Sequence, residues 1–198
     1  LTKKDPYFKT YATPVADYYV VSYNLNDPIM ANIKIRRAIA HAVNRQSIID
    51  KVEKGYGVES IGPFFKTSWA FNPRVKPIAY DPALSVRILK DDGWTDLDGD
   101  GILEKNNQKL KICVMVSAQD QKMRKIAALI RQQLQEVGLR LDIVLYENDQ
   151  EMENVEKSCQ CRLSLIPGCS PDPNDIAKLW HSGNKRKGNT LRGCRRIK

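Results

Sequence analysis

The spacing of apolar residues predicts the secondary structure at the start of the chain. Residues 18–25 are aromatic and β-branched, which is typical of a strand. A helix is predicted next, because apolar residues recur at helical spacing and oppose a polar face that includes His41. These apolar positions are Ile35, Ala38, Ile39, Ala42 and Val43. Asn44 is expected to cap a second helix, which Gly55 ends.

The second half of the chain shows a strand–helix–strand pattern. Residues 110–116 and 139–145 read as apolar strands, and residues 123–137 carry apolar side chains along one helical face. Gly138 stands where this helix is expected to end. Two strands joined by one helix should be parallel, with a right-handed crossover. The fold class predicted from the residues is therefore α/β.

Aspartate followed by proline marks two further predicted helix starts. Asp81 precedes Pro82 and Asp172 precedes Pro173, so each pair combines an N-cap with a proline at the first helical position. A short strand is expected before the second of these helices, at residues 161–166.

An irregular loop is predicted at residues 63–77, and it contains Phe64, Phe65, Trp69 and Phe71. Aromatic side chains in such a loop usually pack over the edge of a core. A role facing a ligand is the alternative interpretation.

Composition adds few constraints beyond the fold class. With 198 residues, 42% hydrophobic and 28% charged, the chain is typical of a globular protein. No apolar run approaches the roughly 20 residues that span a bilayer, and the chain does not open on a signal-peptide pattern.

The net charge of +9 comes mostly from the tail at residues 185–198, which holds seven basic residues and no acidic one. We expect this basic tail to be disordered. Such a tail binds polyanions non-specifically. It contains no aromatic residue to stack on bases, so nucleic acid is not expected as a partner. A basic surface or nucleic-acid-binding module remains the alternative function.

Cysteine and aspartate clusters are the two candidate metal sites. Cys159, Cys161 and Cys169 lack the spacing of paired zinc ligands, and a disulfide among them is the other interpretation. Residues 96–101 match the start of a calcium loop, with carboxylates at Asp96, Asp98 and Asp100, but Asn107 replaces the glutamate expected at position twelve. A turn rich in Asp and Gly is the simpler explanation of this segment. No cofactor is predicted.

No constellation of residues points to catalysis. His41 lies on the polar face of a predicted helix and is expected to be solvated, and nothing around Ser182 forms a nucleophile elbow. The sequence therefore favours a protein that is not an enzyme.

Taken in order, three groups of motifs resemble the peptide and nickel family of solute-binding proteins, extracellular solute-binding protein family 5. The first group is Tyr23-Asn-Leu25 with the helix from Ile35 to Arg45. The second is Tyr80-Asp-Pro82, Gly93-Trp94 and Asp98-Gly-Asp-Gly-Ile102. The third is Asp172-Pro173, Leu179-Trp-His-Ser182 and Asn189. Each motif is weak alone, but their order and spacing cover almost the whole chain.

The resemblance implies one lobe of a periplasmic-binding-protein-like (type II) fold, with a mixed sheet, a βαβ unit and flanking helices. Residues 1–198 would form the second lobe of a two-lobe protein that closes on its ligand. It would serve as the extracytoplasmic solute-binding component of an ABC importer. The implied partners are a small solute, which the family makes peptide-like, the permease subunits and the first lobe. The implied location is the periplasm or the outer face of the bacterial cytoplasmic membrane.

The resemblance also implies where a ligand is bound, in the loop before the helix that Asp172 begins. The contacts would come from Pro167, Gly168, Cys169 and Ser170, with Asp172 beside them. Peptide binders of this family usually carry a tryptophan early in that loop and an aspartate within it, which pairs with the peptide's α-amino group. Here Pro167 stands near the tryptophan position and Cys169 at the aspartate position. Burying an ammonium group without a charge partner is costly, so the departure argues against an ordinary peptide with a free amino terminus.

Overall fold

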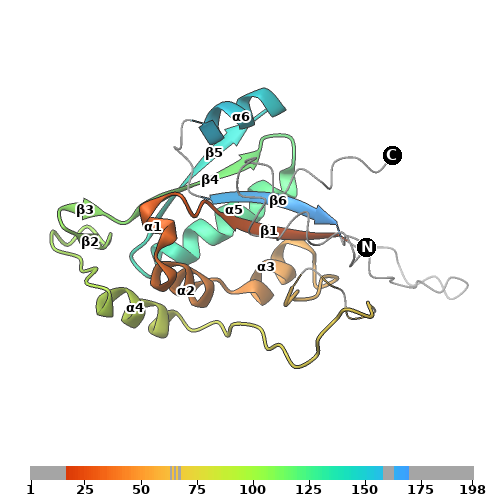
Figure 1. The fold of residues 1–198 in the computed structure, drawn as a ribbon, viewed down its shortest axis with the longest axis horizontal. Coiled ribbons are helices and arrows are strands. Elements are labelled where there is room, and N and C mark those ends of the chain that lie inside the picture. Colours follow the sequence, from red (N-terminus) through yellow and green to blue (C-terminus); the bar gives the residue numbers. More distant parts are fainter. Residues whose placement is uncertain (1–16, 63, 65, 67, 158–162, 170–198) are drawn as a thin grey trace, which may run out of the picture.

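The computed structural model describes residues 17–62, 64, 66, 68–157 and 163–169, and its centre is a four-stranded mixed sheet (Figure 1). The strand order is β1-β6-β4-β5. β4 runs parallel to β5 and β6, whereas β1 runs antiparallel to β6. The strands are β1 (Asp17–Tyr23), β4 (Lys111–Ser117), β5 (Arg140–Tyr146) and β6 (Leu163–Cys169). The predicted α/β class and the predicted parallel pair, β4 with β5, are confirmed.

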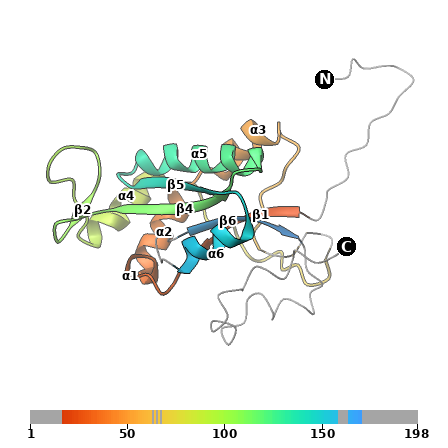
Figure 2. The same cartoon turned by 90° about the horizontal axis from the view of Figure 1, so that it is seen from above.

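Alternate residues of β4 face opposite sides of the sheet, as the pleat of a strand requires. Ile112, Val114 and Val116 belong to the main hydrophobic core, whereas Met115 packs with Tyr146 and Met152 in a smaller second cluster. The helix α5 (Gln121–Gln135) covers the first face, and α6 (Asp149–Lys157) covers the second. Figure 2 shows these two helices on opposite sides of the sheet.

The main core is completed by helices that precede β4 in the chain. They are α1 (Pro28–Ala31), α2 (Ile33–Ala42), α3 (Arg45–Val52) and α4 (Pro82–Asp91). The predicted caps are confirmed: Asn44 Oδ1 accepts a hydrogen bond from the Ser47 N–H at 2.9 Å, and Asp81 Oδ1 accepts one from the Leu84 N–H at 2.8 Å. Both satisfy backbone donors that the first helical turn leaves without an internal partner.

Gly138 ends α5 at a position that excludes a side chain. Its φ is +80°, in the left-handed region, and a Cβ placed there would lie 2.6 Å from Leu103 Cγ. The Gly138 carbonyl also accepts a hydrogen bond from the Leu103 N–H at 2.8 Å. The close approach lets the chain before β4 lie directly over the turn between α5 and β5.

Two elements of the structure were not predicted, and one predicted strand has different bounds. The hairpin of β2 (Glu104–Lys105) and β3 (Gln108–Lys109) was not predicted, because each strand has only two residues. The helix α6 was also missed. The last strand was expected at residues 161–166, but β6 extends to Cys169 because β1 pairs with it along its full length. The helix predicted from Asp172 lies outside the described residues.

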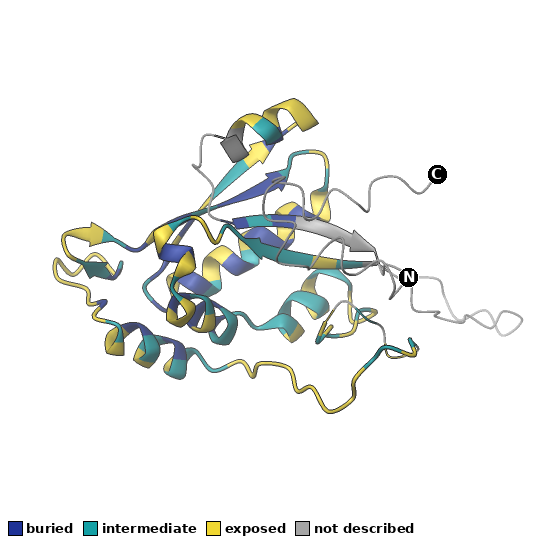
Figure 3. Ribbon diagram, in the orientation of Figure 1, coloured by how far each residue is buried: buried dark blue, intermediate teal, exposed yellow. Residues whose placement is uncertain are grey.

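The expectation that loop aromatics pack over the core edge is wrong for Trp69, whose exposed fraction is 80%. Figure 3 shows the run of exposed residues that links α3 to α4. In the described part of the chain, no helix is long and apolar enough to cross a membrane.

Candidate functional site

The carboxyl ends of the parallel strands meet at one edge of the sheet, and the candidate ligand-binding residues lie there. β4 and β5 end in register at Ser117 and Tyr146, and the parallel strand β6 continues in the same direction to Cys169, beyond its last pairing with β4. In open α/β sheets, ligands bind outside this edge. We call this side of the sheet the carboxyl edge.

The structure places three of the predicted ligand residues in a strand rather than in a loop. Pro167, Gly168 and Cys169 are the last residues of β6 and pair with Tyr19, Tyr18 and Asp17 of β1. On its other side, β6 pairs with β4 only at Leu163 and Ser164. The far end of β6 therefore has β1 as its one described partner strand, and a proline is tolerated where one side of a strand lacks a ladder.

The remaining predicted ligand residues, Ser170 and Asp172, lie outside the described residues. The same holds for the basic tail at residues 185–198 and for Cys159 and Cys161. The described fold brings the part of the proposed binding segment that precedes Ser170 to the carboxyl edge, next to the first residues of β1.

Hydrogen bonds hold the loops of the carboxyl edge in place. The Ala118 N–H donates to the carbonyl of Tyr146 at 2.8 Å, which ties the loop after β4 to the end of β5. Nearby, Lys122 in the first turn of α5 forms an ion pair with Glu53 after α3, with 2.9 Å between Nζ and Oε2. The hydrogen bond from Lys122 to Glu53 raises the pKa of the lysine above its ordinary value. The ion pair thus ties the start of α5 to the end of α3 beside this edge.

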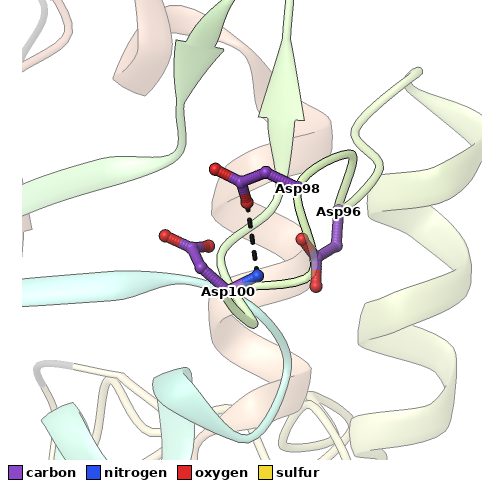
Figure 4. Close-up of side chains that lie close together, drawn as sticks. All are labelled: Asp96, Asp98 and Asp100. Atoms are coloured by element: carbon purple, nitrogen blue, oxygen red, sulfur yellow. Dashed lines mark hydrogen bonds between the residues drawn. The ribbon is translucent and has the colours of Figure 1, made fainter.

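The three aspartates of the predicted calcium loop do come together, at the opposite end of the sheet (Figure 4). Ligand oxygens of Asp96, Asp98 and Asp100 lie within 4.8 Å of one another, and all three residues are exposed. The Asp96 carboxylate accepts hydrogen bonds from the Gly99 and Gly101 N–H groups at 2.9 and 3.0 Å. These are the bonds of an aspartate-stabilised turn.

A lysine supplies the positive charge beside these carboxylates. Lys109 Nζ lies 2.7 Å from Asp98 Oδ2 and 3.3 Å from Glu104 Oε1, and it also bonds Asp100. The hairpin pairs Lys109 with Glu104, which brings the ammonium group to the turn. Its hydrogen bonds to Asp100 and Asp98 raise the pKa of Lys109, and the bond from Lys109 lowers that of Asp100. An internal cation therefore occupies the side of the turn where two of the calcium ligands were predicted.

A second charged cluster, which the sequence analysis missed, centres on Asp92 at the end of α4. Asp92 Oδ2 accepts a hydrogen bond from Asn32 Nδ2 at 2.8 Å, and its carboxylate pairs with Lys34 and Lys105 at 3.3 and 3.2 Å. Burial raises the pKa of Asp92, but hydrogen bonds from Lys105 and Lys34 outweigh that effect, so the pKa lies below its ordinary value. The partners are distant in sequence, so spacing alone could not reveal the cluster. Its role is to join α2, α4 and the hairpin.

A polar cavity of about 440 Å³ lies between the aspartate turn, α5 and the start of β5. Arg131, Arg140 and Asp142 line it, and Arg140 pairs with Asp142 at 3.0 Å. The cavity is at the end of the sheet opposite the carboxyl edge; Asp100 of the aspartate turn lines it, and Pro167, Gly168 and Cys169 do not.

Comparisons with known proteins support the resemblance inferred from the motifs. The profile "Bacterial extracellular solute-binding proteins, family 5 Middle" matches residues 1–188. The oligopeptide-binding protein AppA of Bacillus subtilis is 26% identical over 178 residues, which are 86% of this chain and 32% of that protein. The nickel-binding periplasmic protein of Escherichia coli is 26% identical over 143 residues, or 71% of this chain and 27% of that protein.

Solved structures agree on the fold. AppA of Bacillus subtilis in complex with a nonapeptide gives a TM-score of 0.80 at 23% identity, covering 89% of this chain and 36% of that chain. NikZ of Campylobacter jejuni in complex with Ni(L-His) gives 0.77 at 23% identity, covering 86% and 34%. The periplasmic-binding-protein-like fold class is thereby confirmed. This chain spans about a third of the length of these proteins. With a profile match over residues 1–188, the chain belongs to the bacterial extracellular solute-binding proteins of family 5.

Proposed function

We propose that this chain is one lobe of a two-lobe extracytoplasmic solute-binding protein that delivers its ligand to an ABC importer. The observations that carry the proposal are the family match over residues 1–188 and the mixed sheet in which β1 pairs antiparallel along the whole of β6. In a two-lobe binding protein, the lobes close about a hinge and enclose the ligand between them.

Closure about this hinge would bring the second lobe over the carboxyl edge. A solute held between two lobes is removed from water on both sides, so each lobe alone supplies only part of the contacts. We propose Pro167, Gly168, Cys169, Ser170 and Asp172 as this lobe's contribution. The chemistry proposed is binding and release, and the site is in the periplasm or at the outer face of the cytoplasmic membrane.

The proposed solute is small and peptide-like, without a free ammonium group at the position of Cys169. The relatives are named as oligopeptide-binding, dipeptide-binding and nickel-binding proteins. Membership of the family therefore does not identify the ligand of this chain. A cysteine in place of the family's carboxylate leaves an ammonium without its counter-charge. A blocked or amine-free ligand avoids that cost.

The test compares trialanine with N-acetyl-trialanine, measured by isothermal titration calorimetry on the two-lobe polypeptide. Cys169→Asp should strengthen trialanine binding relative to the acetylated peptide by roughly tenfold, since a charge-assisted hydrogen bond contributes about 1.5–3 kcal/mol. The matched control Cys169→Asn has similar size but no charge and should leave the ratio unchanged. An equal ratio in all three proteins would remove Cys169 from the site.

A further inference from the structure

Three aspartate–glycine bonds occur in the chain, and the chemistry of this dipeptide makes such bonds labile. The backbone nitrogen that follows an aspartate can attack the side-chain carboxyl carbon of that aspartate. Glycine favours the attack because it has no Cβ beside its nitrogen. The three bonds, all within the described residues, are Asp92-Gly93, Asp98-Gly99 and Asp100-Gly101. Each of them is a candidate site of spontaneous modification.

The reaction is an intramolecular condensation followed by hydrolysis. A bond forms between the glycine nitrogen and the aspartate Cγ, the bond from Cγ to its hydroxyl oxygen breaks, and the amide proton leaves with that hydroxyl as water. Water then opens the cyclic imide at either carbonyl, which gives aspartate or isoaspartate. Isoaspartate carries the main chain through its side chain, so the backbone becomes longer and the hydrogen bonds of a tight turn no longer fit.

The glycine nitrogen of every one of these bonds donates a hydrogen bond in the folded chain. The Gly99 and Gly101 N–H groups both donate to the carboxylate of Asp96, at 2.9 and 3.0 Å. The Gly93 N–H donates to the carbonyl of Lys90, also at 2.9 Å. The nitrogen attacks only after its proton is lost, so the hydrogen bond must break first, and breaking it costs free energy.

Lysine ammonium groups lie against all three aspartate carboxylates and stabilise their ionised form. Lys109 pairs with both Asp98 and Asp100, and Asp92 pairs with one lysine of α2 and one of the hairpin. The hydrogen bond from Lys109 lowers the pKa of Asp100. Burial raises the pKa of Asp92, but the hydrogen bonds from its two lysines outweigh that effect and lower it. Because only the protonated carboxyl group loses water readily, ionisation slows the reaction.

The aspartate turn also restrains the orientation of its two reactive carboxylates. Asp98 Oδ1 accepts a hydrogen bond from the Asp100 N–H at 3.2 Å, drawn as the dashed line in Figure 4. Asp100 Oδ1 accepts one from the Ile102 N–H at 2.9 Å. Each carboxylate is thus bonded to the N–H two residues ahead, which opposes its rotation toward the glycine nitrogen beside it.

We propose that Asp98 and Asp100 are isomerisation sites that the folded turn keeps unreacted, and that Asp96 is the residue that blocks both by binding the glycine N–H groups. The third site, Asp92, is blocked independently by the last turn of α4. The proposal goes beyond the proposed function, because it concerns the chemical lifetime of the lobe and holds for any solute. It gives Asp96 a role that requires no metal ion.

Peptide mapping by liquid chromatography and mass spectrometry tests the proposal on the 198-residue chain. Isoaspartyl peptides keep their mass but change their retention time, and electron-transfer fragmentation locates the altered residue. The parent protein is incubated at mildly acidic pH, once folded and once unfolded in guanidinium chloride. Isomerisation at each of the three sites should be at least about tenfold slower in the folded protein, the factor expected for one charge-assisted hydrogen bond. Equal rates in the folded and unfolded protein overturn the proposal.

Asp96→Ala removes both acceptors at once and tests the role of this residue. Isomerisation at Asp98 and Asp100 should rise about tenfold over the folded parent, whereas Asp92 should keep the parent rate. Asp50→Ala is the matched control, because Asp50 is also exposed and lies on α3; it should change none of the three rates. Unchanged rates at Asp98 and Asp100 in Asp96→Ala reject the blocking role. An equal rise at Asp92 rejects it as well, because that result shows general unfolding of the lobe. The comparison of folded with unfolded parent needs no variant and stands in either case.

Discussion

Replacing Gly138 with alanine tests how closely the turn after α5 is packed. Two costs add up in this variant. The first is conformational, because a residue with a Cβ at φ +80° pays about 1–2 kcal/mol. The second is steric: the new Cβ would lie 2.6 Å from Leu103 Cγ and 3.2 Å from each of its terminal methyl groups. Leu103 is buried at 7% exposure, so it has little room to move, and overpacking costs about 1–3 kcal/mol. Gly138→Ala should therefore lower the free energy of unfolding by about 2–5 kcal/mol.

Gly55 supplies a matched control for the steric part. It has the same φ of +80°, but a Cβ there meets nothing within 4 Å. Gly55→Ala should pay only the conformational cost of about 1–2 kcal/mol. Urea unfolding followed by circular dichroism measures both variants, and their difference isolates the contact with Leu103.

A double variant at Gly138 and Leu103 tests whether the two positions are in contact. Leu103→Ala alone should destabilise by about 2–5 kcal/mol through the cavity it leaves. In the double variant Leu103→Ala removes the side chain that the Cβ introduced at position 138 would contact. The loss of unfolding free energy in the double variant should therefore be smaller than the sum of the losses in the two single variants. Equal destabilisation by Gly138→Ala and Gly55→Ala, or full additivity with Leu103→Ala, would refute the steric reasoning.

Three further predictions concern the charged clusters and a buried hydroxyl. Lys109→Met removes the cation beside the aspartate turn, so millimolar calcium should raise the melting temperature of the variant and not that of the parent; a calcium response in the parent would contradict this. The lowered pKa of Asp92 means that its stabilisation is complete above its unfolded-state pKa of about 4 and is lost as the pH falls through its lower folded-state pKa. Urea midpoints of the parent and Asp92→Asn should therefore differ at pH 6 and converge in acid, and a constant gap would argue against the ion pairs. Ser85, fully buried, donates a hydrogen bond to the Ala38 carbonyl at 2.8 Å, so Ser85→Ala should cost about 1 kcal/mol in the same assay; no loss would show that this link between α2 and α4 contributes little.

Local signals were enough to predict the elements whose cause lies within a few residues. Asn44 and Asp81 each cap a helix through a side chain that reaches only three residues ahead. The helix α5 was predicted from its own apolar face, and the parallel pairing of β4 with β5 from the single helix that joins them. In each case the interaction has a fixed period or spacing, which the order of residues records directly.

Contacts between distant segments were decided only by the tertiary structure. The pairing of β1 with β6 joins residues about 150 positions apart and extends β6 to Cys169, which moves Pro167, Gly168 and Cys169 from a predicted loop into a strand. The hairpin brings Lys109 to the aspartate turn, where the sequence offered only the pattern of calcium ligands.

The exposure of Trp69 follows the same principle. Aromatic composition predicts burial in general, but burial depends on whether another element lies over the side chain. Here Arg45 of α3 donates hydrogen bonds to Glu59 and to the carbonyl of Ile78, which hold the chain on either side of Trp69, and no described element covers Trp69. The sequence by itself determined the local elements and the family frame, because capping and periodicity act over short distances. Which surfaces face one another, and which remain to be covered, depends on the packing of the whole chain.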